Sequence, residues 1–253
     1  MRTKHRVALA TIGAAACMPL VGMTSAFAAD GDTMATLKPV PLNEVDGSGT
    51  AMVSVKGTTL TVTMAASGLV EDQPHAAHIH FSAEARHECP VAGDDAEDDG
   101  HLNTTDGGPA YGEVVVSLTK TGDTSPDSVL AVDRYDTAPG GTISYERGSI
   151  EVSDDVAKAV AAGEGVVVIH GVDYNDNGEY DGETKSDLDP SLPTEATDPA
   201  LCGVLAAAPT GGAATGGGAT ATNATPSLAL GGGLLLLAAG SGAYTLRRAR
   251  TQA

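Results

Sequence analysis

Residues 50–64, Thr-Ala-Met-Val-Ser-Val-Lys-Gly-Thr-Thr-Leu-Thr-Val-Thr-Met, decide the fold class of this 253-residue chain. Apolar and polar side chains alternate on both sides of Lys56-Gly57, a pattern that indicates two half-buried strands joined by a tight turn. Further strands are expected at residues 76–81, 113–118, 142–146, 149–152 and 166–169. The last of these is continuously apolar, so we expect both of its faces to be buried.

One helix is expected between these strands. Ser153 can cap the segment from Val156 to Ala162, and Gly163 can end it. Many short strands separated by Gly, Asp and Pro clusters are typical of antiparallel sheets. The sequence therefore predicts an all-β, Greek-key β-sandwich or barrel with one short helix.

The chain is strongly acidic, with 14 Lys and Arg residues against 33 Asp and Glu residues. Six of the basic residues lie near the two ends, so the middle of the chain is more acidic than the total shows. Binding to DNA or RNA needs a basic surface. We therefore expect no nucleic-acid partner, and the sequence identifies no protein partner.

The N-terminus has the features of a secretory signal. Arg2, Lys4 and Arg6 precede an apolar stretch, and Ala26-Phe27-Ala28 offers the small residues of a cleavage site. We expect a signal peptide at 1–28 and a folded domain at 29–205. Cys17 lies within the signal, which leaves Cys89 and Cys202, and a lone extracellular pair most often forms a disulfide.

The C-terminus has the features of a membrane anchor. A stalk rich in Ala, Gly and Thr at 206–227 precedes the uncharged segment 228–246, and the tail 247–253 is basic. The uncharged segment is long enough to cross a bilayer, and positive charges just beyond a span stay in the cytoplasm. We expect a secreted protein anchored in the plasma membrane, with its domain outside the cell.

Three of the histidines cluster in His75-Ala76-Ala77-His78-Ile79-His80. In a strand, His78 and His80 point to the same face, and two adjacent imidazoles suit copper or zinc. A plain pair of surface histidines is the alternative.

The order of further residues resembles that of the copper/zinc superoxide dismutases. Cys89 follows the His-x-His strand, and then come Gly100-His101-Leu102-Asn103, Val167-Val168-Ile169-His170 and Cys202-Gly203-Val204. This resemblance spans roughly residues 36 to 205. It implies that His78, His80 and His170 are copper ligands, that His101 is a bridging ligand, and that Cys89 and Cys202 form a disulfide.

Two departures from that family concern zinc and superoxide. No histidine occurs from Leu102 to Ile169, so zinc is not expected, and Pro199 stands where the family has an active-site Arg. The chain is also similar to the CHRD-type domains of actinobacterial surface proteins, whose hallmark matches Ala77-His78-Ile79-His80. That resemblance implies a superoxide-dismutase-like fold and secretion.

Two acidic segments have the spacing of Ca²⁺ loops. In the first, Asp95, Glu97, Asp99 and Asp106 take positions 1, 3, 5 and 12, and His101 offers its backbone carbonyl at position 7. The second is a partial match, with ligand candidates Asp173, Asn175, Asn177 and Glu179. We expect no helices beside either loop. A solvated charge run is the alternative interpretation.

Two hypotheses for the function follow. The first is a surface-anchored β-sandwich that binds metal ions, Ca²⁺ in the acidic loops and copper at the histidines, as a binding or structural module. The alternative is a copper-only superoxide dismutase at the cell surface. The sequence contains no Gly-x-Ser-x-Gly elbow and no phosphate-cradling glycine loop.

Overall fold

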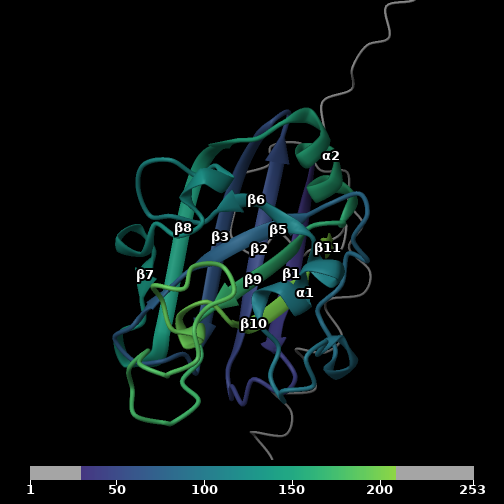
Figure 1. The fold of residues 1–253 in the computed structure, drawn as a ribbon. Helices are drawn as coiled ribbons and strands as arrows, with labels where there is room; N and C mark the ends of the chain where they lie inside the picture. Colours follow the sequence, from purple (N-terminus) through teal and green to yellow (C-terminus); the bar gives the residue numbers. More distant parts are fainter. Residues whose placement is uncertain (1–29, 209–253) are drawn as a thin grey trace, which may run out of the picture. The chain divides into compact units, whose positions relative to one another are not determined.

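The computed structural model describes residues 30–208, which form mostly β-structure with two α-helices (Figure 1). The strands are β1 (Asp30–Pro39), β2 (Ser48–Lys56), β3 (Thr59–Ser67), β4 (Pro74–His75), β5 (Ala77–Phe81), β6 (Glu113–Ser117), β7 (Asp136–Thr137), β8 (Thr142–Glu151), β9 (Val166–His170), β10 (Pro199–Val204) and β11 (Ala206–Ala207). The α-helices are α1 (Thr104–Tyr111) and α2 (Asp154–Ala162). Short 3-10 turns lie at Ala92–Asp94, Pro126–Ser128, Val132–Arg134, Pro139–Gly141 and Thr194–Ala196.

The predicted signal peptide (1–28), membrane anchor (228–246) and basic tail (247–253) lie outside the described residues. Within residues 30–208, neither α-helix has the length and apolar character needed to cross a membrane. The first two residues of the predicted stalk form β11, which pairs with β1. The domain therefore continues past residue 205.

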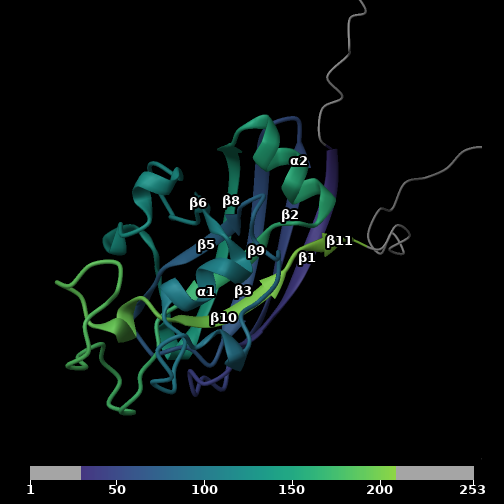
Figure 2. The same cartoon turned by 45° about the vertical axis from the view of Figure 1, so that its right-hand side comes forward.

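One antiparallel sheet dominates the domain. Its strand order is β6-β5-β9-β10-β1-β2-β3-β8, with β11 also paired to β1, and β4 and β7 form a separate short ladder. The sheet curls (Figure 2). Side chains from β2, β3 and β8 therefore meet those from β5, β6 and β9 in a shared core. This curled antiparallel sheet agrees, at a coarse level, with the predicted Greek-key sandwich.

The hairpin predicted at residues 50–64 forms. Lys56 pairs with Thr59, and Gly57 takes a φ of +63° in the two-residue turn between β2 and β3. Glycine adopts positive φ without the steric penalty that a Cβ brings. Alternate side chains then enter the core, among them Val53 and Val62 at no more than 1 % exposure.

Helix α2 lies at the predicted place, but the prediction of a single helix was wrong. The Ser153 hydroxyl accepts a hydrogen bond from the Val156 N–H, and Gly163 ends α2 with a φ of +84°. The unpredicted helix α1 begins at its cap Asn103 and contains Pro109. Glycine and proline have low helix propensity, so the sequence of α1 gave little sign of a helix.

Strand β9 is buried on both faces, as predicted. Val167 and Ile169 enter the main core, whereas Val166 and Val168 belong to a second cluster with Tyr111 of α1. Helix α1 lies against the outer face of this part of the sheet (Figures 1 and 2). Residue 170 continues the outward-facing series, because alternate residues of a strand share a face.

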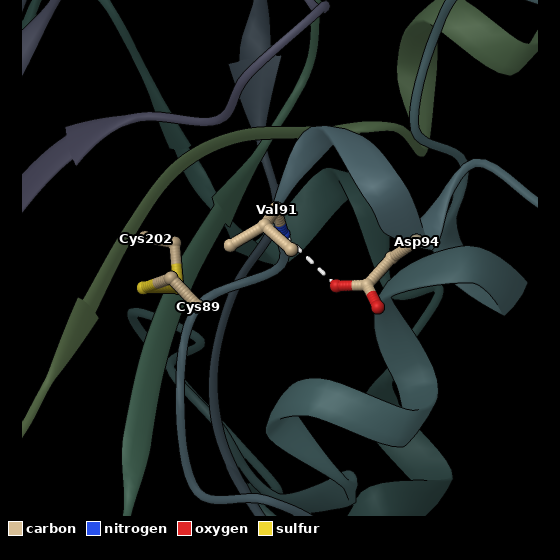
Figure 3. The surroundings of a disulfide bond; sticks show 4 residues. All are labelled: Cys89, Val91, Asp94 and Cys202. Atoms are coloured by element: carbon tan, nitrogen blue, oxygen red, sulfur yellow. Dashed lines mark hydrogen bonds between the residues drawn. A yellow bond between two sulfur atoms is a disulfide. The ribbon is translucent and has the colours of Figure 1, made fainter.

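The expected disulfide joins Cys89 to Cys202, with 113 residues of sequence separation (Figure 3). Cys202 lies in β10, and Cys89 belongs to the long connection between β5 and α1. Beyond the disulfide, the Val91 N–H donates a 2.9 Å hydrogen bond to the Asp94 carboxylate. The bridge therefore fastens this connection to the outer face of the sheet.

Replacement of both Cys89 and Cys202 by Ala should lower the free energy of unfolding by about 4–5 kcal/mol, because a crosslink over a loop this long restricts the unfolded chain. Urea unfolding of the purified protein measures the change. The exposed-site variant Ser48→Ala serves as a control and should stay close to wild type. A double Cys variant as stable as that control would contradict this prediction.

Candidate metal centre

Three histidines meet on the outer face of the sheet. His78 and His80 are two residues apart in β5, and His170 ends the neighbouring strand β9. Each side chain is no more than 3 % exposed. The alternative of a plain surface pair is thus excluded, and the β5–β9 pairing adds His170 from 90 residues further along the chain.

One ring nitrogen of each histidine converges on the others. Ligand atoms from the three rings lie within 4.8 Å of one another. The Nδ1 atom of His78 and the Nε2 atoms of His80 and His170 are buried and have no hydrogen-bond partner. Buried polar atoms normally have a partner, so this arrangement fits the nitrogen ligands of a transition metal such as copper.

The other ring nitrogens bind backbone carbonyls. His80 Nδ1 lies 3.0 Å from the Gly112 oxygen, and His170 Nδ1 lies 2.6 Å from the Thr197 oxygen. A carbonyl oxygen only accepts, so each Nδ1 carries the proton and each Nε2 keeps its lone pair. This second hydrogen bond fixes the tautomer and orientation of a metal-binding histidine.

His78 is held in the same way from its opposite nitrogen. Its Nε2 lies 3.3 Å from the Val129 oxygen and 2.9 Å from the Tyr135 hydroxyl. That hydroxyl donates to the Ser128 carbonyl at 2.8 Å, so its oxygen can accept the imidazole N–H. The Nδ1 lone pair of His78 is therefore free to bind a metal.

Burial keeps all three imidazoles neutral at pH 7. It lowers the pKa of His80 to about 3 and that of His170 to about 4. The pKa of His78 is also lowered well below its ordinary value, first by burial and then by the neighbouring histidines. Neutral imidazole is the form that binds metal ions.

A cavity of about 280 Å³ lies over the three histidines. Apolar side chains form most of its wall, and Glu113 is the only Asp, Glu, Lys or Arg among the described residues that line it. The centre is therefore reached through an apolar space with no cationic side chain.

The imidazole of His101 does not join this cluster. Its Nδ1 lies 3.0 Å from the Asp99 carboxylate and its Nε2 lies 3.8 Å from that of Asp198, while its ring packs edge-on against Tyr174. Burial raises the pKa of Asp198 to about 7. The structure thus places His101 among carboxylates, away from the bridging position that the dismutase resemblance implied.

The first acidic loop brings three predicted ligands together. Carboxylate oxygens of Asp95, Glu97 and Asp106 lie within 4.8 Å of one another, whereas Asp99 turns toward His101. The pKa of Glu97 is raised because Asp106 shares a hydrogen bond with it and adds like charge. A cation between these carboxylates would relieve that repulsion.

Asp106 also corrects an expectation about this loop. It lies in the first turn of α1 and is buried, and its carboxylate accepts the N–H groups of Ala96 and Asn103. Helix α1 therefore begins within the last positions of this loop, although no helix was expected beside it. The acidic side chain of position 12 is held in place by that helix.

The second loop repeats the backbone of the first. Asp173 accepts the N–H groups of Asn177 and Gly178, as Asp95 accepts those of Asp99 and Gly100. The φ angles match at positions 4 and 6, with +54° and +92° in the first loop and +57° and +86° in the second.

The candidate ligands of the second loop are arranged differently. Asn175 and Asn177 donate their side-chain amides to Asp181, and Glu179 is exposed. Within the described residues, no set of three acidic or histidine ligands gathers at this loop. The second loop thus shares the backbone of the first without its convergent carboxylates.

Three residues near these sites were not singled out from the sequence. Tyr135 holds His78, the buried Glu195 accepts the N–H groups of Asp181 and Gly182, and the buried Asn43 bonds the Leu102 backbone. Each acts across a long sequence separation, and none lies in a recognisable motif. The only sign of these roles in the sequence is the residue type, because such polar side chains can form hydrogen bonds with buried backbone groups.

No known family model matches the chain, and no curated protein resembles it closely.

The stability of the metal-free protein should fall as the pH is lowered below about 6.5, because the unfolded histidines take up protons while the folded ones stay neutral. For His80 this loss continues down to its folded pKa of about 3. Each such histidine contributes a slope of about 1.4 kcal/mol per pH unit. Because an unfolded histidine is only partly protonated near pH 6.5, urea unfolding from about pH 7 to about pH 5 should show an average slope smaller by about 1 kcal/mol per pH unit in His80→Gln. An unchanged slope would contradict the buried, neutral state.

Proposed function

We propose that this protein is a secreted, membrane-anchored surface protein whose β-domain binds copper through His78, His80 and His170. Two observations carry the proposal: one ring nitrogen from each of the three buried histidines converges with the others, and each ring keeps one nitrogen without a hydrogen-bond partner. The resemblance of the sequence to the copper/zinc superoxide dismutases supports the same three ligands, and the CHRD-type resemblance supports the fold and secretion.

Backbone segments that lie over the three histidines orient their rings before any ion binds. Carbonyls of Gly112, Val129 and Thr197 hold the three rings with their lone pairs inward, so little rearrangement is needed on binding. Bound copper would supply a Lewis-acidic, redox-active centre there. The apolar wall excludes bulk water from the histidines.

Superoxide dismutation is the alternative function. The three histidine ligands and the disulfide match what the dismutase resemblance implies, but Pro199 replaces the expected Arg, and the cavity wall offers no Lys or Arg. An anion is drawn to a site by positive charge, and this acidic domain supplies the opposite. We therefore favour a binding module, and expect the copper-loaded protein to show dismutation near background.

His80→Ala should abolish stoichiometric copper binding, because a two-histidine remnant holds the ion far less tightly. Electron paramagnetic resonance of the Cu²⁺-loaded protein should show nitrogen coupling in the wild type and lose it in the variant. His87→Ala is the matched control, since His87 lies near β5 and outside the cluster. The His101→Ala variant should also retain the signal. Equal binding by wild type and His80→Ala would refute the proposed site.

The gathered carboxylates of Asp95, Glu97 and Asp106 favour a second site, for Ca²⁺. Carboxylate oxygens are the ligands that Ca²⁺ prefers. The ion would fasten the acidic loop to the N-terminus of α1 and so act as a structural staple. The second loop shares the backbone but lacks this convergence, so we expect it to bind more weakly.

Calcium should raise the melting temperature of chelator-treated protein. With a Kd on the order of 10⁻³ M, 10 mM Ca²⁺ adds about 1.4 kcal/mol of stability, or about 3–6 °C. The Asp106→Asn variant should lose most of this increase, whereas Glu71→Gln, an exposed change outside the loop, should keep it. A transition that does not move at 10 mM Ca²⁺ would rule out the site.

A further inference from the structure

The cavity over the three histidines is large enough for an organic molecule. Its volume is about 280 Å³, while an apolar cavity of about 150 Å³ is known to hold benzene. The wall includes Val129, Leu130, Val132, Leu188, Leu192 and Ala196, and its polar groups are few. Such a pocket, apolar with a few convergent polar atoms, is typical of small-molecule sites.

The charges around the cavity disfavour an anion. Glu113 is the only charged group in the part of the wall that the structure describes. Asp187 and Asp198 lie close enough to raise the pKa of Tyr111 beyond the effect of its burial. In the metal-free protein, an anion that entered would lose its hydration and gain no positive partner, which is strongly unfavourable.

The mouth of the cavity is also apolar. Leu130, Val132 and Leu188 line it and remain 37 %, 41 % and 45 % exposed. Two of them come from the segment between β6 and β7, and the third comes from the segment between β9 and β10. Two separate segments thus place exposed apolar side chains at one opening, where a hydrophobic molecule would enter.

The histidine cluster forms one wall of the cavity. His78, His80 and His170 line it together with Tyr135, and their partnerless ring nitrogens are themselves buried behind that wall. We propose that the cavity binds an uncharged, largely apolar molecule of about one aromatic ring, and brings it onto the histidine cluster. The inference rests on the proposed function, since it assigns a ligand class to the same site.

Two probes of similar size test whether the cavity prefers an uncharged molecule to an anion. Benzyl alcohol and benzoate have nearly the same size, but only benzoate is an anion. Calorimetric titration of the purified, metal-free full chain should show binding of benzyl alcohol and at least about hundredfold weaker binding of benzoate, because a buried unpaired carboxylate costs several kcal/mol. Benzoate binding as tight as that of benzyl alcohol, or no binding of either, would overturn the proposal.

Two variants place the probe in the cavity. Ala196→Phe should fill the cavity, and Leu188→Thr should make its mouth polar. Each variant should lower the affinity for benzyl alcohol by about tenfold or more. Met52→Thr is the matched control, because Met52 is 50 % exposed on β2 and does not line the cavity. Thermal melting checks that each variant folds. Retained affinity in both folded cavity variants would overturn the assignment.

The experiment separates this inference from the copper proposal. Metal-free protein is used for calorimetry, so a failure of copper binding in the resonance experiment leaves the probe result standing. Conversely, copper binding with no affinity for benzyl alcohol would refute the ligand class alone.

Discussion

Three hydrogen bonds between histidine ring N–H groups and backbone carbonyls hold the functional face of this domain together. The carbonyls belong to Gly112, Val129 and Thr197, which lie in three separate segments over the outer face of β5 and β9. The two nitrogens of each imidazole therefore have different roles. One nitrogen fastens a covering segment, and the other is left without a protein partner inside the resulting enclosure. The burial of the three rings and the metal affinity that we propose for them come from the same contacts.

Local patterns predicted the parts of the fold whose side chains follow a clear period. The β2–β3 hairpin, the doubly buried β9 and the capped helix α2 all lie where alternation, apolar continuity and capping residues placed them. Strand β1 was missed, since Thr33, Ala35 and Leu37 alternate inward among residues of modest strand propensity. Helix α1 was missed because its glycines and Pro109 disfavour helices, and tertiary contacts through Tyr111 override that preference.

The residues of the candidate sites also separate into those that local spacing predicted and those that depend on contacts between distant parts of the chain. Spacing alone brought out His78 and His80, and the first acidic loop, because neighbouring residues of a strand or loop meet whatever the rest of the chain does. His170 entered through a family resemblance, and only the β5–β9 pairing gives it a place beside the other two. His101 had a motif but ended among carboxylates. Asn43, Glu195 and Tyr135 satisfy buried groups over long separations, which no local pattern encodes.

The pairing of β1 with β11 has a consequence for chain order. Thr33 lies opposite Ala207, and the Ala208 N–H donates to the Asp32 carbonyl, so the two ends of the folded domain are strand neighbours. A short linker could join them, and new ends could be opened at an exposed turn such as that at Gly122 without cutting a strand. Circular permutants of this kind would keep every sheet contact. The histidine enclosure depends on which strands are adjacent and not on which of them is made first.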